Sequence, residues 1–398
     1  MVSSGYPVSR YSRRPKSLLE SLLGRDSVLW RMDWMLFGAA LVLSIVGTLL
    51  VYSATRGRTE INGGDPYSFA MRHALSVLIG IALAVVFMAV GHRRLRGAVP
   101  VLYMVSLLLI ALVLTPLGAT INGAHAWLRI GALSLQPSEF VKLTMILAMA
   151  ILLATKVDAG DRDHPDGRSV VSALVVAAIP MVIIMLMPDL GSVMVMVVIV
   201  LGVLLTSGAS NRWVAGLIGA GVVGAVLVWQ LKLLDEYQIN RFAAFANPAL
   251  DPAGAGYNTN QARIAIGSGG LFGKGLFNGS QTTGQFVPEQ HTDFIFTVAG
   301  EELGFLGAGS LILLLAVVLW RACRIARSAA DLYSTIVAGG IVAWLAFQTF
   351  ENIGMTLGIM PVAGLPLPFV SYGGTAMFAV WMAVGLLQSI KMQRPVSA

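Results

Sequence analysis

Long uncharged apolar runs alternate with shorter polar segments along nearly the whole chain. Several runs reach the roughly 20 apolar residues that an α-helix needs to cross the ~30 Å hydrocarbon core of a bilayer. The pattern therefore predicts an all-α polytopic membrane protein with ten transmembrane helices. The predicted spans are 34–54, 74–90, 98–115, 139–155, 170–187, 191–207, 213–231, 294–320, 332–350 and 372–390.

The polar segments at the two ends of the chain are short compared with the apolar part. We expect a basic tail over residues 1–31, a ten-helix domain over residues 32–392 and a short tail over residues 393–398. The first apolar run, 34–54, is too long for the core of a signal peptide, and no small-residue cleavage site follows it. This run is therefore expected to remain as the first membrane span.

The composition agrees with a membrane protein. Hydrophobic residues make up 56% of the chain, charged residues make up 12%, and the mean hydropathy is +0.77, whereas about a quarter of the residues in soluble domains are charged. The formal net charge of +7 could indicate nucleic-acid binding. The basic residues lie in short segments between apolar runs, however, so we expect membrane lipids and no nucleic acid as partners. The single cysteine, Cys323, excludes an intramolecular disulfide.

Lysine and arginine are distributed unequally between the two sides of the predicted bundle. One side carries 18 of the 27 basic residues, and positively charged loops tend to stay in the cytoplasm. An even number of spans places both termini on this side. The sequence therefore predicts a multi-pass protein of the cytoplasmic membrane with both termini in the cytoplasm. The basic residues of this side are Arg10, Arg13, Arg14, Lys16, Arg25, Arg31, Arg93, Arg94, Arg96, Lys156, Arg162, Arg168, Arg212, Arg321, Arg324, Arg327, Lys391 and Arg394.

The longest polar segment, residues 232–293, is then expected outside the cytoplasm, between the seventh and eighth spans. Loops longer than about 15 residues inside a compact domain are usually functional or disordered. This segment contains aromatic residues, Asn-Pro and Asp-Pro turns at 247–248 and 251–252, and a glycine-rich stretch. We therefore expect it to be an ordered loop, with the active site facing outward.

An acid lies at the end of this loop. The stretch FVPEQHTDFIFTVAGEELG, residues 286–304, places Asp293 where the loop meets the apolar run 294–320. Such a carboxylate can act as a general base or bind a divalent cation. The dipole of the following helix would favour an aspartate here and lower its pKa, whereas desolvation and the nearby acid Glu289 would raise it. The residues alone do not choose among these roles.

Other charged residues fall close to predicted spans. Glu139 and Lys142 have the i, i+3 spacing of a salt bridge on one helix face, and they could also line a cavity. Asp189 either caps the sixth span or takes part in function. Glu301 and Glu302 are adjacent and cannot both face lipid, so we expect at least one to turn inward to a partner.

The glycine-rich run GSGGLFGKGLFNGS, residues 267–280, does not match a phosphate-binding Walker loop. Ser268 stands where that motif requires glycine, and Gly275 stands where it requires Ser or Thr. Two interpretations remain open. The backbone amides and Lys274 could bind a diphosphate, or the run could be a flexible loop.

Five motifs are spread along the chain: QPSEFVK (136–142), PDLGS (188–192), NRFAAFANPALDPAGAGYNTNQARIAIGSGGLFGKGL (240–276), FVPEQHTDFIFTVAGEELG (286–304) and GLPLPFVSYGG (364–374). These motifs resemble the shape, elongation, division and sporulation (SEDS) family. They occur in the family's order and cover nearly the whole chain from residue 34 onward. GLPLPF and the 240–276 block resemble the elongation members, RodA-like proteins, more than the division members. One departure is Glu351, just outside the ninth span, where the family usually has an apolar residue.

The resemblance implies a peptidoglycan glycosyltransferase that polymerises lipid II at the outer face of the bacterial cytoplasmic membrane during cell elongation. It implies a class B penicillin-binding protein as partner. Asp293, in the HTDF motif, is the implied general base or metal ligand, with Mg²⁺ or Mn²⁺ as cofactor and no organic cofactor. The residues that we assign to substrate binding are Arg72, Glu139, Lys142, Asp189, Gln238, Arg241, Arg263, Lys274, Ser280, His291 and Ser371.

Two other functions are compatible with the same motifs. A lipid II flippase would need a polar path through the bundle. Glu139, Lys142 and Asp189 would suit such a path, but the cytoplasmic halves of the spans are almost uniformly apolar. A non-catalytic membrane scaffold for a transpeptidase would keep its function without Asp293.

Overall fold

The computed structural model describes residues 31–121, 124–130, 133–187, 189–231 and 254–393, together with positions 239 and 245. The predicted basic tail over residues 1–31 therefore lies almost wholly outside the described residues, and so does the tail over 393–398. The helices and strands are α3 (Trp34–Thr55), α4 (Thr59–Asn62), α5 (Ser68–Val90), α6 (His92–Val113), β1 (Gly118–Ile121), β2 (Ala124–Ile130), β3 (Leu133–Leu135), α7 (Pro137–Asp158), α8 (Gly167–Met185), α9 (Leu190–Thr206), α10 (Asn211–Gln230), α12 (Ala255–Ser268), α13 (Ser280–Thr283), α14 (Ile295–Arg327), α15 (Leu332–Leu357) and α16 (Gly374–Met392).

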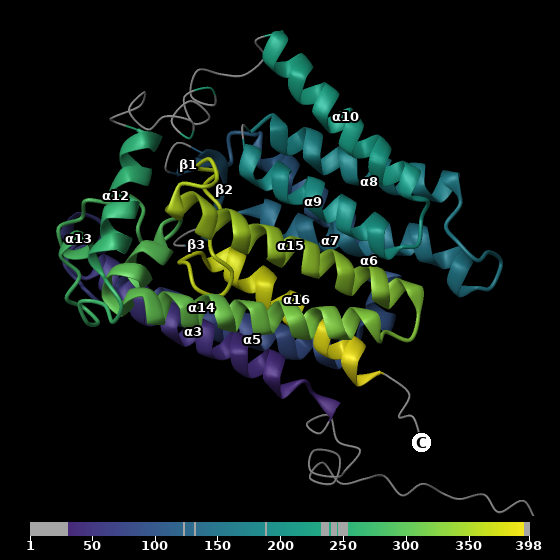
Figure 1. Cartoon of the computed structure of the whole chain (residues 1–398). Coiled ribbons are helices and arrows are strands. Elements are labelled where there is room, and N and C mark those ends of the chain that lie inside the picture. Colours follow the sequence, from purple (N-terminus) through teal and green to yellow (C-terminus); the bar gives the residue numbers. More distant parts are fainter. Residues whose placement is uncertain are drawn as a thin grey trace, which may run out of the picture.

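The long helices lie side by side and form a bundle (Figure 1). Among the described residues, nine helices are long and apolar enough to cross a membrane, and α9 is a shorter apolar helix of 17 residues. Each of the ten predicted spans overlaps one of these helices. The all-α polytopic class is thus confirmed, and the count of ten spans stays a prediction because α9 is so short.

Several helices extend beyond the predicted spans. α6 begins at His92, six residues before the predicted start, so Arg93, Arg94 and Arg96 belong to its first turns. α15 continues to Leu357, and Glu351, which was expected just outside the ninth span, is fully buried within it. Hydropathy detects the apolar part of a helix and misses ends whose polar side chains face protein or solvent.

The segment between the third and fourth predicted spans contains a small antiparallel sheet in the order β1-β2-β3. Leu128 of β2 pairs with Gly118 on one side and Leu135 on the other. Such short strands give a weak sequence signal, which explains why the pattern did not predict them. The sheet leads directly into Pro137, the first residue of α7.

The centre of the bundle is formed by α7, α15 and α16, which are the most buried of the long helices. Glycines permit close packing here, as expected between membrane helices. A Cβ atom at Gly202 of α9 would lie 2.3 Å from the Cβ atom of Ala343, and one at Gly80 of α5 would lie 2.9 Å from the ring of Trp381. At the edge, α10 has no buried residue and lies apart from most other helices (Figure 1).

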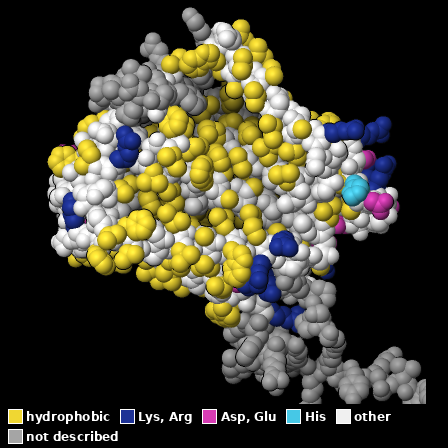
Figure 2. Space-filling view, viewed as in Figure 1, with side chains coloured by type: hydrophobic (Ala, Val, Ile, Leu, Met, Phe, Trp, Pro, Cys, Tyr) yellow, Lys and Arg dark blue, Asp and Glu magenta, His cyan; other side chains and the backbone are white. Residues whose placement is uncertain are grey.

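The two ends of the bundle differ in their polar residues. One end, called the Asp293 end, carries α12, α13, the sheet and the loops 286–294 and 364–374 (Figure 1). The other end, called the arginine end, contains the arginine-rich segments that the sequence assigned to the cytoplasmic side. Figure 2 shows one face of the bundle, with hydrophobic side chains over its middle and Lys and Arg side chains toward its two ends. The ion pairs at the arginine end are Arg321–Asp33, Arg93–Asp331, Arg96–Asp158 and Lys156–Asp166.

Candidate active site

Asp293 lies in a turn directly before Phe294, the N-cap residue of α14. Its side chain is half-buried. The amide nitrogen of Asn352, on α15, donates hydrogen bonds to the carbonyl oxygens of Asp293 and Leu365, each over 2.7 Å. Gly364 has φ +72°, and a Cβ atom there would lie 3.4 Å from Oδ2 of Asp293. One amide therefore joins the acid-bearing turn to the loop 364–374, whose backbone approaches the carboxylate.

An aromatic cluster packs against the same turn. The amide of Tyr372 donates to the carbonyl oxygen of His291 over 2.9 Å. The His291 ring lies 5.1 Å from the ring of Phe69 and 5.6 Å from that of Tyr372. The guanidinium carbon of Arg72 lies 5.9 Å from the Phe69 ring centre. Arg72 and His291, both predicted site residues, thus contact the same ring, and His291 precedes Asp293 by two residues.

Burial determines the charge of this cluster. Burial, together with the positive charge of Arg58, lowers the pKa of His291 to about 4, so its ring is neutral near pH 7. Arg58 donates to the carbonyl oxygen of Val287 over 2.9 Å. Burial lowers the pKa of Arg58 and raises that of Tyr372, while Arg72 acts on Tyr372 in the opposite direction. The cluster therefore combines a neutral imidazole with two arginines.

Two amide side chains of α15, four residues apart, position the loop 364–374. Asn352 is one of them, and Gln348 is the other. Gln348 donates to the carbonyl oxygen of Pro366 over 2.8 Å and accepts from Nζ of Lys142 (3.3 Å) and Nε1 of Trp344 (2.7 Å). Sequence reasoning missed both amides. Their i, i+4 spacing in a largely apolar helix was the available signal.

Glu139 and Lys142 form the salt bridge that their spacing predicts. Nζ of Lys142 lies 2.7 Å from Oε1 of Glu139, and the two side chains are 0% and 2% exposed. Nζ also lies 5.1 Å from the ring centre of Trp344. Lys142 donates to Gln348, and Gln348 donates to Pro366 of the loop 364–374. The pair is therefore connected to this loop through Gln348. A direct contact of either residue with substrate stays a prediction.

Asp189 caps α9, one of the two roles that the sequence allowed. Its carboxylate accepts from the amide of Ser192 over 2.9 Å and from the Ser192 hydroxyl over 2.7 Å. The start of α9 also packs on the loop before 364, because a Cβ atom at Gly191 would lie 2.5 Å from the carbonyl oxygen of Ala363. Asp189 therefore fixes the start of α9, which packs against the loop before residue 364. A further role of Asp189 in function stays a prediction.

The long helix α14 is interrupted near the candidate site. Gly304 has φ +68° and ψ −168°, which are not helical. Beyond the break, the amide of Phe305 donates to the carbonyl oxygen of Gly270 over 2.8 Å, and that of Leu306 donates to Leu271 over 3.1 Å. The glycine-rich run therefore pairs with the backbone of the broken helix, which satisfies amides that the interruption would otherwise leave without partners.

Two buried glutamates complete this junction. Glu301 and Glu302 are 0% and 1% exposed, which confirms that at least one turns inward. Glu301 accepts from Nζ of Lys274 (2.7 Å) and from the amides of Gln281 and Thr282 (2.8 Å each). The amide of Lys274 donates to the carbonyl oxygen of Glu301 over 3.0 Å. This amide is thus unavailable to a diphosphate. Hydrogen bonds anchor the run to α14, although the side chains of Leu271 and Phe272 are exposed.

The two predicted serines differ in their surroundings. Ser280 is exposed and accepts from Nζ of Lys274 over 2.7 Å. Ser371 is buried, and its hydroxyl oxygen accepts from the amide of Leu367 over 2.8 Å. Ser371 therefore shapes the loop 364–374, while Ser280 faces solvent beside a cation. Contact of either with substrate stays a prediction.

The remaining residues assigned to substrate binding are Arg263, Gln238 and Arg241. Arg263 lies on α12 with an exposed side chain, and its Cδ would lie 3.6 Å from a Cβ atom at Gly358, where α15 ends. Gln238 and Arg241 lie outside the described residues, so the structure neither supports nor opposes their assignment. Arg263 is thus a cation near the end of α15, the helix that contacts Asp293.

Bundle and site together define a polytopic membrane protein with a half-buried acid at one end, enclosed by two loops and an interrupted helix. The family model described as cell cycle protein, which covers FtsW, RodA and SpoVE, matches residues 33–395. The chain belongs to this family.

Relatives and solved structures agree with this assignment. Stage V sporulation protein E of Bacillus subtilis is 38% identical over 359 residues, covering 90% of this chain and 96% of the relative. A protein of Thioalkalivibrio named probable peptidoglycan glycosyltransferase FtsW is 37% identical over 371 residues, covering 92% and 91%.

Two solved structures are similar over the same length. A chain described under "Structural coordination of polymerization and crosslinking by a peptidoglycan synthase complex" aligns with a TM-score of 0.74 at 29% identity, covering 90% of this chain and 97% of that one. The crystal structure of the rod shape determining protein RodA of Thermus thermophilus aligns with a TM-score of 0.65 at 30% identity, covering 90% and 96%. These names include a sporulation protein, an FtsW and a rod shape determining protein, so the branch to which this chain belongs stays a prediction.

Proposed function

We propose that this protein is a peptidoglycan glycosyltransferase that polymerises lipid II, with Asp293 as the group that activates the acceptor. Family membership and the names of the relatives support the reaction class. The observation that carries the assignment of Asp293 is its position in a half-buried turn that Asn352 joins to the loop 364–374. Such a turn can present a carboxylate in a fixed orientation to a substrate at the membrane boundary.

In the proposed reaction, the Asp293 carboxylate takes the proton from the 4-hydroxyl of the acceptor GlcNAc. The freed oxygen attacks C1 of the donor MurNAc, so a C1–O glycosidic bond forms while the C1–O bond to the diphosphate breaks. Undecaprenyl diphosphate leaves with the bonding electrons. General-base assistance of this kind contributes roughly 10²–10⁴ in rate.

The leaving diphosphate needs positive charge near it. Arg72 and Arg263 are exposed cations at the Asp293 end, and Arg241 is a further candidate from sequence alone. Lys274 is engaged with Glu301, so we assign it to the glycine-rich junction first and to the substrate second. The neutral His291 packs beside Arg72 without adding charge.

A divalent cation stays part of the proposal. The described residues contain no group of three or more His, Cys, Asp or Glu side chains that could bind a metal ion. Mg²⁺, however, commonly binds one or two carboxylates together with substrate phosphates. In that arrangement Asp293 would supply one oxygen and the substrate diphosphate the others. A bound cation would supply charge neutralisation for the leaving group.

Orientation and partner follow from the same proposal. The arginine end would face the cytoplasm under the positive-inside rule, which places Asp293 at the outer face of a bacterial cytoplasmic membrane. A class B penicillin-binding protein would cross-link the product, in line with the synthase complex among the similar structures. The GLPLPF motif supports a role in cell elongation.

The test compares purified wild type, Asp293→Asn and Glu60→Gln with fluorescent lipid II, the cognate transpeptidase and Mg²⁺ or Mn²⁺, with moenomycin present. Glu60 is an exposed acid of α4 at the same end, so its variant controls for loss of one charge. We expect long glycan from wild type and Glu60→Gln and none from folded Asp293→Asn. Equal polymer from all three would remove Asp293 from the mechanism. Polymer from none would favour the flippase or scaffold.

A further inference from the structure

A cavity of about 520 Å³ lies at the arginine end, between the end of α5, the start of α6 and the end of α16. The cavity and the candidate active site lie at opposite ends of α5. Phe69, at the start of α5, contacts His291 of the site, whereas Val85 and Met88, near the end of α5, line the cavity. The function proposed above makes no use of it.

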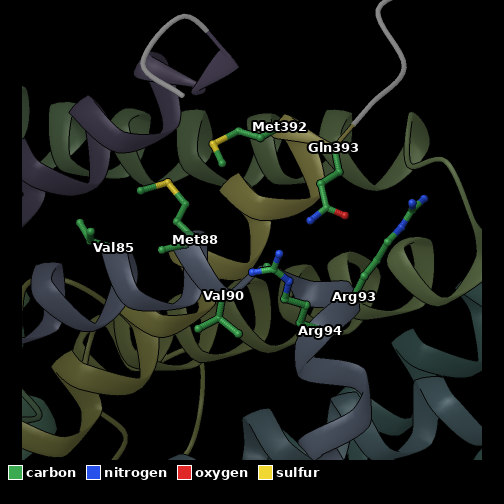
Figure 3. A pocket seen from close by; sticks show the side chains of 9 residues that line it. Val85, Met88, Val90, Arg93, Arg94, Met392 and Gln393 are labelled. Atoms are coloured by element: carbon green, nitrogen blue, oxygen red, sulfur yellow. The ribbon is translucent and has the colours of Figure 1, made fainter. Parts of the chain in front are cut away.

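The cavity has two chemically different walls (Figure 3). Val85, Met88 and Met392 form an apolar wall on one side. Arg93, Arg94 and the amide of Gln393 lie on the other side. No carboxylate lines it. A ligand that fits both walls must combine an anionic group with a hydrocarbon chain.

The charge of the two arginines is only partly offset by carboxylates of the described residues. Arg93 contacts Asp331 over 3.3 Å, but its side chain remains 60% exposed. Arg94 forms no ion pair with a carboxylate of the described residues. Both lie in the first turn of α6, which contains no acidic residue. Cations are disfavoured at this end of a helix, so an anion between them would stabilise the arrangement.

The apolar wall continues into surface suited to lipid. On α5, Leu78, Val85 and Val86 are 64%, 50% and 52% exposed. An acyl chain lying on this surface would reach the cavity where the hydrocarbon region ends. Orientation by positive charge would require arginines near a membrane helix, but it would not require a cavity that joins their guanidinium groups to an apolar wall.

We propose that this cavity binds one anionic phospholipid. Its phosphodiester contacts Arg93, Arg94 and the amide of Gln393, and an acyl chain lies along Val85 and Met88. Basic pockets between membrane helices on the cytoplasmic side commonly bind such headgroups. The ligand class follows from the charge and polarity of the walls.

The test measures lipid retention by native mass spectrometry of the full-length protein in micelles that contain dioleoyl phosphatidylglycerol or dioleoyl phosphatidylcholine. The charge variant is Arg93→Gln/Arg94→Gln. Its matched control is Arg162→Gln/Arg168→Gln, which removes two exposed arginines, one in the loop between α7 and α8 and one at the start of α8. We expect wild type and control to prefer phosphatidylglycerol, and the charge variant to bind it about tenfold more weakly.

A second variant tests the cavity itself. Met88→Trp keeps every charge and fills the space beside Met392, so we expect it to lose phosphatidylglycerol as well. Retention like that of wild type would overturn the proposal, and so would equal losses in the two arginine variants. Binding of inorganic phosphate alone with the affinity of the lipid would make this a soluble-anion site. Lipid uptake only after deletion of residues 394–398 would show that the chain itself occupies the cavity.

Discussion

The Asp293 end and the arginine end of the bundle differ in how far most of their paired charged side chains are exposed to solvent. At the Asp293 end, the Glu301 carboxylate is fully enclosed and accepts hydrogen bonds from a lysine, two amides and a hydroxyl. At the arginine end, the Asp33 carboxylate is also buried, against Arg321. The other ion pairs there are partly exposed, and the side chains of Arg96 and Asp158, for example, are 31% and 16% exposed. Breaking a buried pair costs about 3–5 kcal/mol, whereas an exposed pair contributes about 0–1 kcal/mol.

This difference indicates what each end is built for. Enclosed and fully hydrogen-bonded groups keep one geometry, which is what a reaction site needs to stabilise developing charge. Exposed ion pairs adapt to solvent and lipid headgroups. The Asp293 end therefore has the rigid framework of a reaction site, and the arginine end has the features of a surface that contacts charged lipids.

The largest effect on stability is expected at Glu301. Glu301→Ala removes the acceptor of Lys274, Gln281 and Thr282 and leaves buried donors without a partner, so we expect a loss of about 3 kcal/mol or more. Thermal unfolding followed by tryptophan fluorescence measures it. Lys274→Met is the matched control, because it leaves Glu301 with its amide donors. An equal and small loss in both variants would contradict the enclosed character of this junction.

A pH effect of up to about 3 kcal/mol is expected from His291. Its pKa is about 4 in the folded protein against an ordinary value of 6.5, so the unfolded chain binds the proton first. Stability is therefore fully present above pH 6.5 and falls as the pH decreases from 6.5 toward 4. Unfolding curves of wild type and His291→Phe between pH 4 and 8 measure the difference. Parallel curves would show that His291 does not contribute.

A smaller effect is expected at Asn352. Asn352→Ala removes the two hydrogen bonds that join Asp293 and Leu365, at a cost of about 1–3 kcal/mol. Because this amide orients the turn that carries Asp293, we expect the rate of polymerisation to fall while the affinity for lipid II changes little. A change in affinity alone would argue against an orienting role.

The smallest effect is expected at the arginine end. Arg96→Gln breaks the partly exposed pair with Asp158, and we expect a stability change of about 0–1 kcal/mol that shrinks further at high salt. The same unfolding measurement applies. A loss as large as that of Glu301→Ala would remove the contrast between the two ends.

Much of the fold could be predicted because membrane helices carry strong local signals. Apolar runs located each of the nine long apolar helices of the described residues and the shorter α9. Arginines of the predicted cytoplasmic side lie at one end of the bundle, where they form the pairs Arg93–Asp331 and Arg96–Asp158. The i, i+3 spacing predicted the Glu139–Lys142 pair. The sheet in residues 118–135 was missed because its strands are too short to give a clear pattern.

The sequence by itself determined the class of the protein, the approximate spans, the distribution of charge and the acid at position 293, because each depends on residues close together in the chain. Only the tertiary structure decided what surrounds that acid. Asn352 contacts Asp293 across 59 positions, and the glycine-rich run pairs with a helix that breaks at Gly304. Such contacts depend on how helices pack and on which backbone groups an interruption leaves unpaired, and no local pattern encodes either.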